Sequence, residues 1–177
     1  ITKTSSLLIG HFNHESTVLD GGLRTSGDNY DILQDAANVL VVDTGAATLS
    51  SVDPARVALG DSASIPGSAK VALGAATAAI LDRKSGDLWV VPVKGIASFE
   101  LKAADPTAEL GENADVAVAK DGTVFGLSAD KGEVVTIPVD NEGQALKPSS
   151  ASVGDIDPSG EHSITAVGDK PVVLDRD

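Results

Sequence analysis

Residues Val71 to Val93 read VALGAATAAILDRKSGDLWVVPV, and this stretch decides the fold because two others repeat its order of apolar runs and turns. They are ILQDAANVLVVDTGAATLSSVD from Ile32 and VAVAKDGTVFGLSADKGEVVTIPV from Val116. A fourth stretch, ITAVGDKPVVLDRD from Ile164, begins the same pattern and stops halfway. Repetition at this length indicates units whose apolar faces are covered only by their neighbours.

The period of the repeat is marked by a polar residue that ends the second apolar run of each unit. The four copies of this residue are Asp43, Asp82, Ser128 and Asp175. Successive copies lie 39, 46 and 47 residues apart, and spacings of about 40–50 residues are typical of a four-stranded propeller blade. The apolar runs are short and bounded by Gly, Asp and Pro, which favours strands over helices.

Tight turns divide each unit into antiparallel strands. In the unit from Val116, the turns are KDG at 120–122 and ADKG at 129–132, each ending on glycine. RKSG at 83–86 is the counterpart in the preceding unit. Glycine supplies the positive φ that such hairpin turns require, so the sequence predicts hairpins at all three places.

We therefore expect an all-β, β-propeller-like domain over residues 1–177, with about four blades of four-stranded antiparallel sheet. The predicted parts are a half-blade at 5–24, blades at 28–65, 69–110 and 114–149, and a half-blade at 160–177. If the two half-blades pair, the chain closes a four-bladed ring. Otherwise it is an open arc of a larger propeller with exposed strand edges. A sandwich of hairpins is the alternative fold.

Composition excludes several classes of function. The formal net charge is −13, which argues against nucleic acid as a partner because phosphate backbones are bound by clustered Lys and Arg. No apolar run approaches the roughly 20 residues of a membrane helix, so no membrane contact is expected of this part of the chain. Cysteine is absent, which removes disulfides, thiol nucleophiles and zinc thiolate sites.

Three stretches resemble a family of large actinobacterial surface proteins described as fibronectin type III or Ig-like domain proteins. They are LLIGHFNHESTVLDGGL from Leu7, YDILQDAANVLVVDTGAATLSSVDP from Tyr30 and ITAVGDKPVVLD from Ile164. The resemblance implies an extracellular, propeller-like region, with one membrane anchor upstream, further blades after Asp177 and fibronectin type III modules downstream. These 177 residues contain no such module themselves, since Trp89 and Tyr30 do not fit its buried Trp and tyrosine corner.

One motif suggests a metal ion. Asp155, Asp157, Ser159 and Gly160 spell D-x-D-x-S-G, the opening of a calcium loop in which alternate side chains converge on one cation. The twelfth position is Ala166 where the loop needs Glu. DPSG is also a favoured type I turn, and these points favour a turn over calcium. Asp155, Asp157 and Ser159 remain the candidate metal ligands.

The three histidines give a weaker hypothesis. His11 and His14 are three residues apart, which on a strand places them on opposite faces. If the terminal half-blades pair, His162 approaches them and a cluster forms. The alternative is that all three are exposed near turns.

No catalytic motif stands out, since a nucleophile elbow, a phosphate-binding glycine loop and an H-E-x-x-H helix are all missing from the sequence. Asp43, Asp82 and Asp175, which recur at the same place of the repeat, are expected to cap turns through their side chains. We therefore expect a non-enzymatic extracellular binding or structural module with no cofactor. Its expected partner is a protein or cell-wall component, or another copy through exposed strand edges. The alternative is a cation-dependent carbohydrate-binding or hydrolytic propeller with its site in the central funnel.

Overall fold

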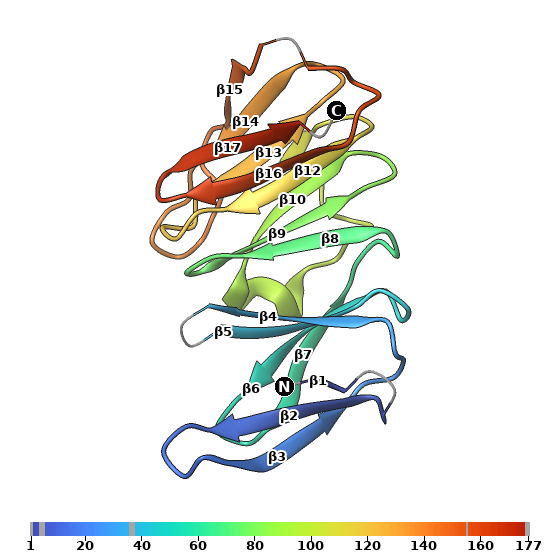
Figure 1. Cartoon of the computed structure of the whole chain (residues 1–177), viewed down its shortest axis with the longest axis vertical. Coiled ribbons are helices and arrows are strands. Elements are labelled where there is room, and N and C mark those ends of the chain that lie inside the picture. Colours follow the sequence, from blue (N-terminus) through green and yellow to red (C-terminus); the bar gives the residue numbers. More distant parts are fainter. Residues whose placement is uncertain (1, 4–5, 36–37, 155, 176–177) are drawn as a thin grey trace.

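The computed structural model describes residues 2–3, 6–35, 38–154 and 156–175, which form five antiparallel sheets arranged in chain order (Figure 1). Within each sheet, strands that are consecutive in the sequence are hydrogen-bonded neighbours. Three sheets have four strands, the first has three and the last has two. A short 3-10 helix, η2 (Val93–Ser98), follows the third strand of the third sheet.

The strands have the following bounds. The first sheet consists of β1 (Thr2–Lys3), β2 (Leu8–Asn13) and β3 (Val18–Arg24). The second consists of β4 (Tyr30–Asp35), β5 (Asn38–Asp43), β6 (Thr48–Asp53) and β7 (Ala58–Ser64). The third consists of β8 (Ala69–Leu73), β9 (Thr77–Asp82), β10 (Asp87–Pro92) and β11 (Ala108–Glu109). The fourth consists of β12 (Ala114–Val118), β13 (Val124–Ser128), β14 (Glu133–Ile137) and β15 (Ser149–Ser152), and the fifth of β16 (His162–Val167) and β17 (Lys170–Asp175).

The first strands of the last four sheets lie side by side. β4 contacts β8, β8 contacts β12, and β12 contacts β16. Consecutive four-stranded meanders whose first strands adjoin are the blades of a propeller. The chain therefore has a β-propeller-like fold, as the repeat predicted, and the sandwich alternative is wrong.

The arc is open. The sheet of β1, β2 and β3 lies at one end of the molecule and the sheet of β16 and β17 at the other, and the two share no strand pairing among the described residues (Figure 1). The four-bladed ring that would pair the two half-blades is therefore not formed within one chain.

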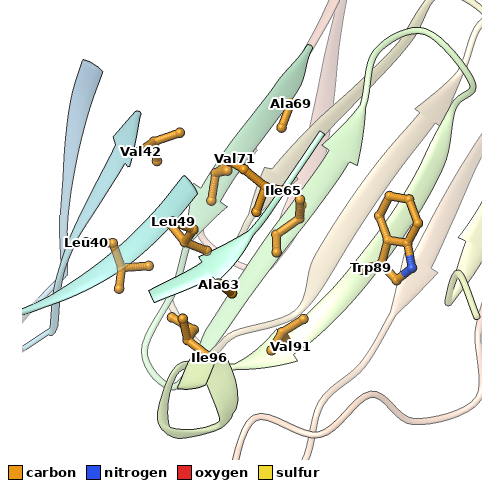
Figure 2. Packing of buried hydrophobic residues seen from close by; sticks show 12 residues of the cluster. Leu40, Val42, Leu49, Ala63, Ile65, Ala69, Val71, Trp89, Val91 and Ile96 are labelled. Carbon is orange, nitrogen blue, oxygen red and sulfur yellow. The ribbon is translucent and has the colours of Figure 1, made fainter. Parts of the chain in front are cut away.

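The core is divided into three layers, each between two successive sheets. Figure 2 shows the first layer, where Leu40 and Leu49 of the second sheet meet Val71 and Val91 of the third. The second layer joins the third and fourth sheets, and the third joins the fourth and fifth. The two inner sheets are thus apolar on both faces.

This burial on both faces explains the continuous apolar runs in the sequence. Along β9, Ala78 and Ile80 belong to the first layer, whereas Ala79 and Leu81 belong to the second. Successive side chains of a strand point to opposite faces, so a strand covered on both sides has no polar face to alternate with the apolar one.

The turns are built as predicted. Gly86, Gly122 and Gly132 have φ of 77°, 93° and 60°, values that favour glycine. The turn after β5 is capped by Asp43, whose Oδ1 accepts the Ala46 N–H at 2.8 Å. Such side-chain to backbone bonds fix the turn and the register of the strands that flank it.

Candidate functional site

The adjoining first strands of the last four sheets are called the inner strands: β4, β8, β12 and β16. Each inner strand carries a polar residue at its second position. In the antiparallel ladders, Lys70 of β8 faces Leu81, Asp115 of β12 faces Leu127, and Asp31 and Ser163 hold the same place in β4 and β16. These residues occupy one level of the arc where the strands of successive blades adjoin. That level can therefore carry polar contacts from blade to blade.

Asp115 joins three blades through such contacts. Its Oδ1 lies 2.5 Å from the Lys70 Nζ of the preceding blade, and its Oδ2 accepts the Ile164 N–H of the following blade at 3.0 Å. The Asp115 side chain is 7% exposed and that of Lys70 is 37% exposed. The two carboxylate oxygens thus bond to the two neighbouring strands, and the side chain holds β8, β12 and β16 in register.

A polar cavity of about 460 Å³ opens over this contact. The residues with charged or polar side chains in its lining include Lys70, Arg83, Asn113, Asp115, Glu161 and His162. Since Lys70 and Asp115 neutralise each other, the charges left for a ligand are the exposed guanidinium of Arg83 and the exposed carboxylate of Glu161. One side of the opening is fixed by Asn113, whose Nδ2 donates to the Pro158 carbonyl at 2.9 Å.

His162 lies at the wall of this cavity with its side chain almost fully buried. Its Nε2 is 3.4 Å from Asp175 Oδ1, but the two atoms are not aligned for a hydrogen bond, and neither ring nitrogen has a hydrogen-bond partner among the described residues. A buried polar atom without a partner destabilises the fold. The ring nitrogens are closed off from solvent, and the charged group beside them is the Asp175 carboxylate.

The calcium motif forms a turn. Asp157 Oδ1 accepts the Ser159 N–H at 2.9 Å and the Ser159 hydroxyl at 2.8 Å, while the Asp157 carbonyl accepts the Gly160 N–H at 3.0 Å. The backbone and side-chain bonds from Ser159 hold the pKa of Asp157 below its ordinary value. Asp155 lies outside the described residues, so calcium binding at Asp155, Asp157 and Ser159 stays a prediction.

The predicted histidine cluster does not form, because the sheets that carry His11 and His162 lie at opposite ends of the arc (Figure 1). In the first sheet, His11 Nδ1 lies 2.6 Å from Asp20 Oδ1, and Asn13 Nδ2 donates to the other Asp20 oxygen at 3.0 Å. The hydrogen bond with His11 lowers the pKa of Asp20. His162 belongs to the polar cavity instead.

The repeated polar residue has different tasks in different units. Asp82 accepts the Ser68 hydroxyl at 2.6 Å and the Lys84 N–H at 2.9 Å, and so caps its turn as Asp43 does. Partial burial alone would raise the pKa of Asp82, but these bonds outweigh it and the pKa lies below its ordinary value. In contrast, Ser128 donates to the Leu110 carbonyl at 2.5 Å, and Asp175 faces His162. The turn-cap prediction, made for Asp43, Asp82 and Asp175, is therefore confirmed for Asp43 and Asp82.

Sequence comparison and structure comparison give different results. No protein-family model and no curated protein matches the sequence, whereas known structures match its fold. The chain is similar to virginiamycin B lyase from Staphylococcus aureus, with 11% identity, a TM-score of 0.55 and coverage of 94% of this chain and 56% of that one. It is also similar to apo AztD from Citrobacter koseri, with 11% identity, a TM-score of 0.54 and coverage of 88% and 43%. For BamB from Moraxella catarrhalis the identity is 11%, the TM-score 0.51 and the coverage 92% and 48%.

These similarities concern the fold, since the identities are low. They agree with the propeller arrangement, and the chain spans about half the length of the structures it matches. Within the described part of the chain, no helix has both the length and the apolar character that crossing a bilayer requires.

Proposed function

We propose that this chain is a non-enzymatic binding module of a bacterial surface protein and that the polar cavity beside Asp115 is its ligand site. The observation that carries the proposal is the bond from Lys70 through Asp115 to Ile164, which fixes three blades around one opening. Binding sites on repeat scaffolds use such rigid frames to present side chains from several repeats.

The chemistry of the cavity favours a peptide segment of a protein partner or of the cell wall. Arg83 and Glu161 present opposite charges, which suits a ligand that carries both a carboxylate and an amine. Asp115 and Lys70 are bonded to each other and so offer no free base or nucleophile for catalysis.

The cellular setting rests on the family resemblance. A parent protein of that kind would be extracellular, held by one membrane helix outside these residues, and would carry fibronectin type III or Ig-like modules. The net charge of −13 also suits a module that stays soluble and does not bind nucleic acid.

The test is capture of a partner from cell-wall extract, followed by titration of the captured component by calorimetry. We expect Arg83→Ala and Glu161→Ala each to weaken binding about tenfold, a loss of about 1.4 kcal/mol. Arg56→Ala is the matched control, because this arginine is highly exposed on the turn between β6 and β7. Equal binding by all three variants would contradict the site, and reproducible turnover of a cell-wall glycan would contradict the non-enzymatic assignment.

A further inference from the structure

The fifth sheet exposes an apolar face. Val172 and Leu174 of β17 are 39% and 51% exposed, whereas Val173 between them packs against the fourth sheet. Val167 lies on the same outer face, because its ladder partner Lys170 is an even number of residues from Val172 and Leu174. This outer face points away from the rest of the arc.

The corresponding face is covered in every other unit. Val172 and Leu174 stand three and one residues before the repeated Asp175. The pairs at these places in the three preceding units are at most 5% exposed. They are Leu40 and Val42, Ala79 and Leu81, and Phe125 and Leu127. Each belongs to the core layer with the following sheet, so the pair on β17 is the one without such a sheet.

The second sheet provides the matching surface at the other end of the arc. A cleft of about 750 Å³ lies between the first and second sheets, and its lining includes Ile32 of β4 and Val39 of β5. In strand register these two residues correspond to Val116 and Val124 of the fourth sheet. Val116 and Val124 are fully buried in the layer that contains Ala79 and Leu81, so the cleft is where a pair equivalent to Val172 and Leu174 would pack.

The first and fifth sheets are also complementary in their strands. The first sheet has only the two-residue β1 beside β2, paired with Leu8 and Ile9. The fifth sheet consists of β16 and β17, and β17 has six residues. Placed along β2 instead of β1, β17 would extend the ladder over more of that strand. The order β16, β17, β2 and β3 would then be that of a complete blade.

We propose that two copies of this chain associate head to tail, each inserting Val172 and Leu174 of β17 into the cleft beside Ile32 and Val39 of the other. Three complete sheets per copy and two shared blades make a ring of about eight blades, which is within the known range of propellers. In each copy, Val172 and Leu174 of β17 are then covered, as the equivalent pairs of the three preceding units are.

The oligomeric state of the 177-residue chain tests this arrangement, measured by analytical ultracentrifugation over a concentration series. We expect a dimer. Leu174→Lys and Val39→Lys should each weaken dimerisation at least tenfold. Each variant places a lysine in both interfaces of the dimer, because every interface joins β17 of one copy to the cleft of the other. Leu146→Lys is the control, since Leu146 is similarly exposed but lies on neither surface. Emission of the single Trp89 verifies that each variant is folded.

Mixing the two variants separates this arrangement from other dimers. A mixture of Leu174→Lys and Val39→Lys retains one unaltered contact per pair, so we expect a dimer to return. Dimerisation should also strengthen with added salt, because two chains of charge −13 repel each other. A monomer at all concentrations, a dimer insensitive to both variants, or a mixture that stays monomeric would overturn the proposal.

Discussion

Replacing Asp115 by alanine removes a side chain that bonds three successive blades. The variant leaves the Ile164 N–H without its acceptor in a buried place and leaves Lys70 without its carboxylate. A hydrogen bond to a charged group contributes about 1.5–3 kcal/mol. Lys70 is 37% exposed and can turn to water, so its ion pair adds about 0–1 kcal/mol. We expect Asp115→Ala to lower the free energy of unfolding by about 2–4 kcal/mol.

Urea unfolding followed by Trp89 fluorescence measures this loss, since the indole is buried and its Nε1 donates to the Ala104 carbonyl at 3.0 Å. Asp31→Ala is the matched control. Asp31 holds the same place in β4, is exposed, and accepts a hydrogen bond from the adjacent Ile32 N–H. Its loss should change stability by less than about 0.5 kcal/mol. Equal costs for the two variants would refute the view that Asp115 ties the blades together.

Two further predictions follow from single residues. Gly86→Ala should cost far more stability than Gly154→Ala in urea unfolding. Both glycines have positive φ, which costs alanine about 1–2 kcal/mol at either place. A Cβ on Gly86 would lie 2.0 Å from the Gly111 carbonyl oxygen, whereas a Cβ on Gly154 would meet open space. Equal losses of stability in the two variants would contradict the close contact at Gly86. For Asp82, the lowered pKa stabilises the fold above the ordinary aspartate pKa of about 4, and this contribution is lost as the pH falls from that value through the lower pKa of the folded state. Ser68→Ala should therefore be less stable than the natural chain at neutral pH, with a difference that shrinks below about pH 4; a difference independent of pH would show that the Ser68 bond does not lower the pKa.

The strands and turns could be predicted because the signals are local. Glycines at 86, 122 and 132 end four-residue or three-residue turn motifs, and each has the positive φ that the motif requires. The apolar runs predicted strands correctly, and their lack of alternation is the mark of sheets covered on both faces. The repeat then predicted that neighbours would supply that cover.

The repeat pattern left the closed ring and the open arc as alternatives for a physical reason. Whether two half-blades meet depends on the angle between successive sheets, which accumulates over all the interfaces and is set by no single residue. The histidine cluster failed for the same reason, since it required His162 to return to the first sheet.

The polar cavity was missed because its contacts are distant in the chain. Asp115 bonds to residues 45 and 49 positions away. A partial signal was present, because Asp31, Lys70 and Ser163 each lie 12 residues before the repeated polar residue of their unit. Asp115 lies 13 residues before Ser128, so it falls out of this alignment by one position.

The central claim is that successive sheets pack only on their neighbours in the sequence. Methyl–methyl nuclear Overhauser contacts in an Ile-, Leu- and Val-labelled sample test it most directly. The structure predicts contacts across each core layer, such as Leu81 of the third sheet with Val116 of the fourth in the second layer, and Leu127 of the fourth sheet with Ile164 of the fifth in the third layer. Contacts between Leu40 or Leu49 of the first layer and Leu127 or Ile164 of the third would contradict the arrangement of blades.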